Sequence, residues 1–197
     1  INLIFVPKQY ISCETIVYEG LKAVRYAVNS IDADMPKRYL IELSSHGGNS
    51  LREFQNIFIR SRLQLIGMTH GIMEYVDNNI SKYIRNGIEF VEHEVNEIKK
   101  RHNASRVLYD YVCNNVSPSE AVSDKLLEAN IVKSLGSEYT YEAAKIAQKL
   151  LGAKGFESGH PMSNIAIDIR PFTIFEGNNE MLYADIFDIF SKENEKE

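Results

Sequence analysis

Apolar residues recur every three to four positions along most of the chain that follows the Gly47–Ser50 segment. This spacing places them on one face of a helix, so the pattern predicts long amphipathic helices. The first stretch carries Leu51, Phe54, Ile57, Phe58, Leu65, Met68, Ile72, Met73 and Val76. The second carries Ile88, Val91, Val95, Ile98, Leu108 and Val112, and polar His102 and Ser105 interrupt its middle.

Two further helices are indicated downstream. The segment Ser117-Pro118-Ser119-Glu120 is a capping box with proline at the first helical position, and the helix it starts is expected to stop at Gly152. Its apolar stripe consists of Leu126, Ile131, Leu135, Ala143, Ile146 and Leu150. A loop rich in Gly, Ser and Pro is expected over 152–163. The last helix is expected to begin near 178–180 and to carry Met181, Leu182, Ile186 and Ile189. Four helices with short connections predict a mainly α fold, an up-down four-helix bundle.

The first 34 residues show a different pattern, which is typical of β-strands. β-Branched and aromatic residues cluster at 3–6, 15–18 and 23–31, and Pro7, Gly20 and Pro36 bound these runs. The chain opens on Ile-Asn-Leu-Ile-Phe-Val, which is neither a Met start nor the basic start of a signal peptide. We therefore expect this part to be the inside of a β-domain whose other segments lie upstream.

Composition argues against several classes of function. The net charge of −5 gives no electrostatic reason to bind nucleic acid or an anionic membrane, and no apolar run approaches the roughly 20 residues of a bilayer span. Cys13 and Cys113 lie far apart, which favours reduced thiols in a cytoplasmic protein, with the mitochondrial matrix left open. The histidines show no metal-ligand spacing, and neither a P-loop nor a Ser-His-Asp arrangement is visible.

The C-terminal part contains an ordered set of motifs. In chain order these are Leu151-Gly152-Ala153-Lys154-Gly155-Phe156, His160-Pro161, Asp168, Arg170 and Ile174-Phe175-Glu176-Gly177-Asn178-Asn179-Glu180-Met181. The set resembles the closing signature of acyl-CoA dehydrogenases. That family shows Gln-x-x-Gly-Gly-x-Gly-Phe, then Tyr-Pro, then Ile-Tyr/Phe-Glu-Gly-Thr-Asn-Glu, and the spacing between the pieces matches without gaps. An ordered set of this kind is far more specific than any one of its pieces.

The resemblance extends upstream. Residues 35–51 look like the family's junction between its β-domain and its bundle, and Arg62, Gly71 and Tyr83 fall at the family's spacing along the first bundle helix. It implies that residues 1–35 form the end of the middle β-domain, 36–53 the junction, 54–191 the C-terminal four-helix bundle and 192–197 a disordered tail. The family's N-terminal helical domain and most of its β-domain have no counterpart in this sequence.

The resemblance makes Glu176 the catalytic base, which abstracts a proton α to an acyl-CoA thioester while the β-hydride moves to FAD. Such a base acts in a dry pocket, which Phe175 would line, and Gly177 would let the backbone approach the substrate. Arg62 falls where the family contacts CoA. For Glu176 the residues alone favour a simpler interpretation, a loop glutamate stabilised by a helix N-terminus. For Arg62 they leave a solvated arginine on a helix surface open as an alternative.

The family's flavin contacts are altered in this sequence. The resemblance implies that the cofactor-binding residues are Phe90, Lys149, Gly152, Ala153 and Asn178. Lys149 replaces the family's glutamine, Ala153 its second glycine and Asn178 its threonine. Gly87 and Val91 replace an arginine and a glycine in the family's Tyr-x-x-x-Arg-x-x-Phe-Gly element. A lysine can still pair with a pyrophosphate.

These features predict a flavin-dependent acyl-CoA dehydrogenase that works as a homodimer or homotetramer, with electron-transfer flavoprotein as an electron acceptor. Two alternatives stay open. One is an acyl-CoA oxidase-like enzyme, which passes electrons to oxygen. The other is a non-catalytic assembly subunit with degenerate flavin contacts, which Gly87, Val91 and Asn178 favour and Glu176 opposes. The chain by itself is expected to be inactive, because upstream segments would supply most of the flavin pocket.

Overall fold

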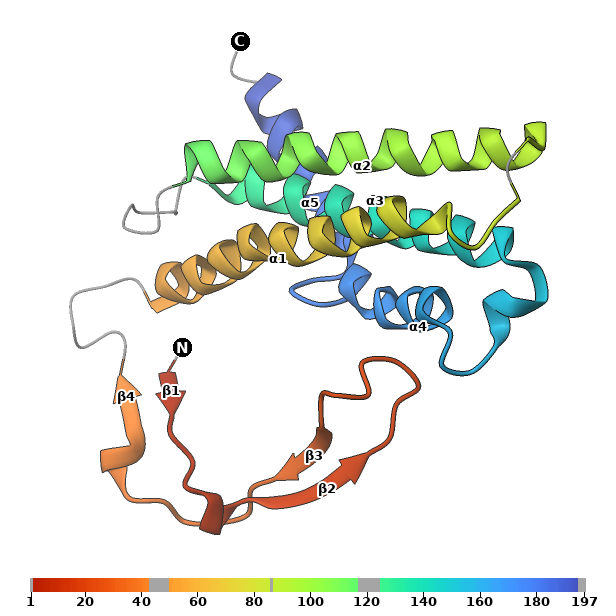
Figure 1. Cartoon of the computed structure of the whole chain (residues 1–197). Helices are drawn as coiled ribbons and strands as arrows, with labels where there is room; N and C mark the ends of the chain where they lie inside the picture. The colour runs from red at the N-terminus through yellow and green to blue at the C-terminus, as the bar shows by residue number, and fades with distance from the viewer. Residues whose placement is uncertain (1, 43–49, 86, 117–124, 195–197) are drawn as a thin grey trace. The chain divides into compact units, whose positions relative to one another are not determined.

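The computed structural model describes residues 2–42, 50–85, 87–116 and 125–194 (Figure 1). The chain divides into two compact units, Ile1–Ile57 and Phe58–Glu197, and each is described by itself. The capping box expected at 117–120 lies outside the described residues, as do residues 195–197 of the expected tail.

The first unit contains two small antiparallel ribbons. Strand β1 (Asn2–Ile4) pairs with β4 (Leu40–Glu42), and β2 (Ser12–Ile16) pairs with β3 (Tyr26–Ser30). Each strand is shorter than or offset from the apolar run that predicted it, and β4 was not predicted as a strand. Two-stranded ribbons bury little of either face, so the alternation of side chains that marks a half-buried strand is weak here. Val17, one residue beyond β2, is 92% exposed.

The second unit is a helical bundle. It contains most of α1 (Ser50–Ile80), then α2 (Glu89–Asn115), α3 (Leu126–Leu150), α4 (Pro161–Asp168) and α5 (Asn179–Asn194). Short 3₁₀ turns η4 (Gly152–Phe156) and η5 (Arg170–Thr173) flank α4. The predicted mainly α fold with a helical bundle is therefore confirmed. The prediction of a loop over 152–163 is wrong in part, because this segment contains η4 and its last residues begin α4. The start of α4 is capped by His160, whose Nδ1 accepts from the Met162 N–H.

The buried face of α1 differs from the predicted stripe. Its buried apolar residues are Ile59, Leu63, Ile66, Met73, Val76 and Ile80. Together with buried Thr69, which lies between Ile66 and Met73, they follow one another at steps of three and four residues. Ile57 and Met68, which the sequence placed on the stripe, are exposed. The helix has apolar residues on two faces, so periodicity alone did not decide which face packs.

Helix α3 lies at the centre of this unit, and small or polar side chains form its buried surface. It contacts α2, α4 and α5, and it shares a core cluster with α1 (Figure 1). Its buried residues are Ala129, Asn130, Val132, Lys133, Ser134, Gly136, Ser137, Thr140, Ala143, Ala144 and Ala147. The larger apolar residues of the predicted stripe are mostly only half-buried. Small side chains let neighbouring helices approach closely, and a central helix has little face left for solvent.

Candidate active site

The motif that contains Glu176 forms a tight turn between η5 and α5. The N–H groups of Ile174 and Phe175 both donate to the carbonyl of Pro171 at 2.9 Å. Glu176 then has a φ of +58° and Gly177 a φ of +108°. Because left-handed conformations are rare for a residue with a Cβ, the turn at Glu176 must be held by its surroundings.

Asn178 and Asn179 connect this turn to α5. The Oδ1 of Asn178 accepts from the Glu180 N–H at 3.1 Å and so caps the N-terminus of α5. Asn179 is buried, and its Nδ2 donates to the Ser137 hydroxyl at 3.1 Å and to the Glu138 carboxylate at 3.2 Å. The start of α5 is thereby bound to α3.

Arg62 of α1 holds the turn from one side. Its Nε donates to the backbone carbonyl of Glu176 at 2.7 Å, and its Nη1 donates to the Oδ1 of buried Asn130 at 2.6 Å. Burial lowers the pKa of Arg62, and the charges of Asp185 and Glu176 oppose that shift. Arg62 is therefore not the solvated surface arginine of the simpler interpretation, since it directly joins α1 to the backbone of the candidate base.

Lys133 of α3 holds the same turn from another helix. Its ammonium donates to the carbonyl of Gly177 at 2.5 Å, to the Oδ1 of Asn179 at 2.7 Å and to the carbonyl of Thr173 at 3.2 Å. The residue is 1% exposed. Burial, followed by the charge of Arg62, lowers the pKa of Lys133 to about 8, while the nearby Glu176 carboxylate acts in the opposite direction.

The Glu176 side chain itself is left available. It is half-buried, and within the described part of the chain its carboxylate has neither a hydrogen-bond nor an ion-pair partner. Ile174, at 59%, and Phe175, at 36%, are exposed in this chain. The arrangement therefore fixes the backbone of the turn while the carboxylate stays free to accept a proton.

The sequence interpretation named Glu176 and Arg62 as site residues, and the structure brings them together. It did not name Lys133, Asn130 or Asn179 as site residues. Lys133 and Asn130 lie three residues apart on one face of a helix whose other residues there are small. A lysine and an asparagine on a buried helix face require partners, because burying an unpaired charge or amide is unfavourable. That pattern is visible in the sequence and could have indicated that Lys133 and Asn130 bind specific partners.

The candidate flavin residues fall into two groups. Asn178 belongs to the turn, and the next residue, Asn179, binds Ser137 of α3. Lys149 lies near the C-terminal end of α3, about 18 Å from Ser137 along the helix axis at the usual rise of about 1.5 Å per residue. There its Nζ is 4.9 Å from the centroid of the Phe90 ring. The two groups therefore lie too far apart to form one compact binding site.

The surroundings of Lys149 suit a phosphate group, apart from one opposing feature. Lys149 and Phe90 are exposed, and Gly152, with a φ of +58°, faces open space in which an added Cβ would meet nothing within 4 Å. An open glycine backbone beside a cation suits a phosphate. However, the Nζ of Lys149 also pairs with the Glu94 carboxylate at 2.9 Å, which offsets its charge.

The polar interruption of α2 pairs with α1. The Nδ1 of His102 lies 2.7 Å from the Oδ2 of Asp77, and the hydroxyl of buried Ser105 lies 3.3 Å from the Nδ1 of His70. Burial lowers the pKa of His70, and nearby His102 adds to that shift. These contacts satisfy the polar groups between two helices. Among the described residues, no group of three or more His, Cys, Asp or Glu side chains could hold a metal ion.

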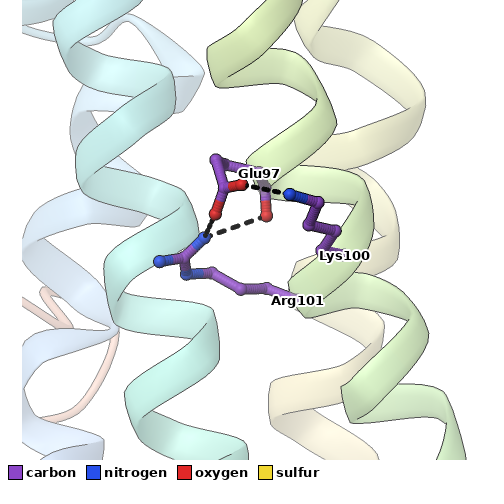
Figure 2. Close-up of polar contacts among 3 residues, drawn as sticks. All are labelled: Glu97, Lys100 and Arg101. Carbon is purple, nitrogen blue, oxygen red and sulfur yellow. Dashed lines mark hydrogen bonds and ion pairs between the residues drawn. The ribbon is translucent and has the colours of Figure 1, made fainter.

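A separate charged cluster lies along one face of α2 (Figure 2). The Glu97 carboxylate accepts from Lys100 at 2.6 Å and from Arg101 at 2.8 Å, and these two hydrogen bonds lower the pKa of Glu97 to about 2. All three residues belong to the same helix at spacings of three and four, which is typical of pairs that stabilise an exposed helix rather than of a binding site.

No described helix is both long and apolar enough to cross a membrane.

Comparisons with known proteins identify relatives of this chain. The family described as acyl-CoA dehydrogenase, C-terminal domain, matches residues 51–189. The mitochondrial very long-chain specific acyl-CoA dehydrogenase of Macaca fascicularis is 25% identical over 143 residues, which cover 68% of this chain and 22% of that protein.

Solved structures with the same fold include three of interest. A probable acyl-CoA dehydrogenase from Mycobacterium abscessus has a TM-score of 0.83 at 16% identity, covering 96% of this chain and 52% of that chain. The acyl-CoA dehydrogenase from Geobacillus kaustophilus has a TM-score of 0.81 at 16% identity, with coverages of 95% and 51%. PigA with FAD and proline has a TM-score of 0.80 at 16% identity, again with coverages of 95% and 51%.

At this identity the structural likeness concerns the fold alone, and the chain spans about half the length of these structures. The match over residues 51–189 covers the bundle, the Arg62 position and the turn that contains Glu176. The chain therefore belongs to the acyl-CoA dehydrogenase family, of which it contains the C-terminal domain.

Proposed function

We propose that the protein catalyses α,β-dehydrogenation of an acyl-CoA thioester, with Glu176 as the base that takes the α-proton. The observation that carries this proposal is the turn itself, in which Arg62 and Lys133 bind the backbone at and after Glu176, while its carboxylate has no hydrogen-bond or ion-pair partner among the described residues. A base is effective when its backbone is fixed and its proton-accepting atoms are free.

The chain's own residues have separate roles in this reaction. Glu176 accepts the α-proton, Phe175 offers an exposed ring beside it, and Gly177 brings the backbone close to the substrate. Arg62 uses Nε to hold the turn and Nη1 to bind Asn130 of α3, so a contact with the CoA moiety would use its Nη2. FAD, when bound, supplies the acceptor for the β-hydride.

The proposed cofactor contacts follow the two groups described above. Asn178 would contact the flavin beside Glu176, and Phe90, Lys149, Gly152 and Ala153 would contact the flavin of a neighbouring subunit in a homodimer or homotetramer. The separation of the two groups along α3 supports this division.

Residues 1–35 would be the end of a β-domain, 36–53 the junction and 54–191 the bundle. Electron-transfer flavoprotein is the proposed acceptor, and the proposed compartment is the cytoplasm or the mitochondrial matrix.

The pairing of Lys149 with Glu94 favours a second candidate, a non-catalytic assembly subunit. A lysine whose charge is offset by a carboxylate attracts a phosphate less strongly. An acyl-CoA oxidase-like enzyme would share the site and differ in passing electrons to oxygen. The visible spectrum separates these functions. A yellow protein that acyl-CoA bleaches and that stays bleached in air is the dehydrogenase, and one that air rapidly re-oxidises is the oxidase. A colourless protein that FAD does not reconstitute indicates the subunit.

The role of Glu176 is tested by Glu176→Gln, which keeps the shape of the side chain and removes the base. Bleaching of the full-length flavoprotein by acyl-CoA is expected to slow by at least about 10²-fold, since general-base catalysis contributes on that order. Glu180→Gln is the matched control, because Glu180 is an exposed carboxylate in the first turn of α5. Normal bleaching by the Glu176 variant, or equal losses in both variants, would contradict the assignment.

A further inference from the structure

We propose that Lys133 is a positioning residue for the base: from the N-terminal half of α3 its ammonium binds the backbone on both sides of Glu176 and so fixes where the carboxylate points. This inference rests on the proposed role of Glu176. It assigns a function to a residue that does not belong to the motif containing the base and that lies 43 positions before it in the chain.

The contacts of Lys133 span the turn. Thr173 precedes Glu176 by three residues, Gly177 follows it directly, and Asn179 begins α5. The ammonium donates to the carbonyl oxygens of Thr173 and Gly177 and to the side-chain oxygen of Asn179. An ammonium has three N–H donors, so all three are used within this one turn. Lys133 therefore joins the end of η5, the turn and the start of α5 to a single point on α3.

Burying a lysine at this position is unfavourable if the side chain does no more than fill the core. Lys133 is among the largest fully buried side chains of the chain, and it lies on a helix face that small residues otherwise form. Burying a charge is unfavourable unless its donors are satisfied, and an apolar side chain of similar length would fill the same volume without that desolvation. What an apolar residue cannot do is bind three oxygen atoms of a turn. The contacts with the turn are thus the property that distinguishes lysine at this position.

The turn needs such a residue because of its backbone conformation. Glu176 has a positive φ, which is unfavourable for a residue with a Cβ, and Gly177 follows with a second positive φ. Arg62 binds the Glu176 carbonyl from α1, and Lys133 binds the Gly177 carbonyl from α3. Two consecutive carbonyls are therefore held by two cations from different helices. Removing one of them leaves the conformation of the turn held from one side only.

The experiment compares Lys133→Met with Thr140→Val in the full-length flavoprotein. Methionine keeps the length of the side chain and removes the donors. Thr140 is equally buried on the same helix, but its hydroxyl donates to the carbonyls of Thr69 and Gly136 and has no contact with the turn. The measurements are amide hydrogen exchange over 173–179 and steady-state kinetics with an acyl-CoA.

Lys133→Met is expected to speed exchange in 173–179 severalfold and to lower kcat by roughly 10- to 100-fold with KM nearly unchanged, because a displaced base loses alignment with its proton. Thr140→Val is expected to change neither. If Lys133→Met does not fold, Lys133→Gln, which retains two N–H donors, is expected to show a smaller change of the same kind. Exchange in 173–179 that is no faster than in Thr140→Val overturns the inference.

The two proposals fail in different ways. If acyl-CoA does not bleach the wild-type flavoprotein, the proposed function is wrong, while the exchange measurement still shows whether Lys133 holds the turn. If the wild type is bleached and Lys133→Met keeps both its kcat and its slow exchange, the role of Lys133 is wrong and that of Glu176 stands. A uniform rise in exchange along α1, α2 and α3 would also overturn the inference, because it indicates global destabilisation instead of a local contact.

Discussion

Gly177 meets two restrictions at once, a backbone φ of +108° and crowding by its neighbours. A Cβ at this position would lie 3.2 Å from the Nη2 of Arg62 and 3.2 Å from the Cδ2 of Leu182. Gly177→Ala is therefore expected to lower the free energy of unfolding by about 2 kcal/mol or more, since the positive φ alone costs about 1–2 kcal/mol. It should also slow acyl-CoA bleaching, because the alanine displaces the arginine that binds the Glu176 carbonyl.

Gly87→Ala is the control for that prediction. Gly87 has a φ of +82°, and a Cβ there would meet nothing within 4 Å. This variant carries the backbone strain without the crowding, so it should lose less stability than Gly177→Ala in urea denaturation and should bleach normally. Equal losses of stability in the two variants would show that the contact with Arg62 is unimportant.

At this scale the sequence predicted one part of the site and not the other. Glu176 was identified because it lies in a contiguous motif whose order resembles a known family. Lys133 was missed because its partners are backbone carbonyls, which any sequence could provide, and because they lie 40 or more positions away. Contacts of that kind depend on how α3 and α5 pack together, which local periodicity does not determine.

The packing of α3 against α1 yields a prediction for these two helices. A Cβ at Gly136 would lie 2.6 Å from the Cδ1 of Ile66 and 3.3 Å from the Oγ1 of Thr69. Gly136→Ala gains about 1 kcal/mol of helix propensity, yet overpacking costs typically about 1–3 kcal/mol, so a net loss of stability is expected. Gly71→Ala on α1 has open space around its Cβ and should gain about 0.5–1 kcal/mol.

Ile66→Val removes the atom that a Cβ at Gly136 would meet. The Gly136→Ala/Ile66→Val double variant should therefore lose less stability than the sum of the two single variants, by about 0.5 kcal/mol or more. Thermal or urea unfolding of the four proteins of this cycle measures the coupling. Strict additivity would mean that the backbone of α3 shifts to make room and that Ile66 does not limit the approach of the helices.

The helices were predictable as elements, but their buried faces were less so. The sequence placed α1 and α2 within a few residues of their observed bounds, because long apolar periodicity is a strong signal. It assigned to α3 a stripe of mostly large apolar residues, of which only Ala143 is buried, whereas the structure also buries Ala144, Ala147 and a set of serine and threonine hydroxyls. Those hydroxyls bind carbonyls of their own helix, as Ser134 binds Asn130 at 2.7 Å, and so need no distant partner. Such residues look exposed in a sequence and are well suited to a central helix.

The whole molecule brings together features that are far apart in the sequence. Strand β4 depends on its pairing with β1, which no local pattern indicates, and the 3₁₀ turns are too short to give a periodic signal. The family match covers 51–189 and explains why the ordered motifs at the C-terminus resemble a signature. Lys149 lies near the C-terminal end of α3, far from the candidate base, so a change at Lys149 leaves the turn at Glu176 intact, whereas the altered Asn178 belongs to that turn. Loss of the flavin contact at Lys149 and retention of the base are therefore physically compatible within one chain.

The stability of the whole protein should depend on pH through Lys133. Burial lowers the pKa of Lys133 to about 8, helped by the charge of Arg62 and opposed by Glu176 and Glu138, while in the unfolded chain the pKa is near 10.5. Between these values the unfolded chain binds more protons than the folded one, so the free energy of unfolding should rise with pH, by at most about 1.4 kcal/mol per pH unit. Below about pH 8 the group is charged in both states and contributes no slope. Urea unfolding of the wild type and of Lys133→Met from pH 7 to pH 10.5 isolates this contribution as the difference between the two proteins. A difference that falls with pH would show instead that the third hydrogen bond, which a neutral amine cannot donate, outweighs the desolvation of the ammonium.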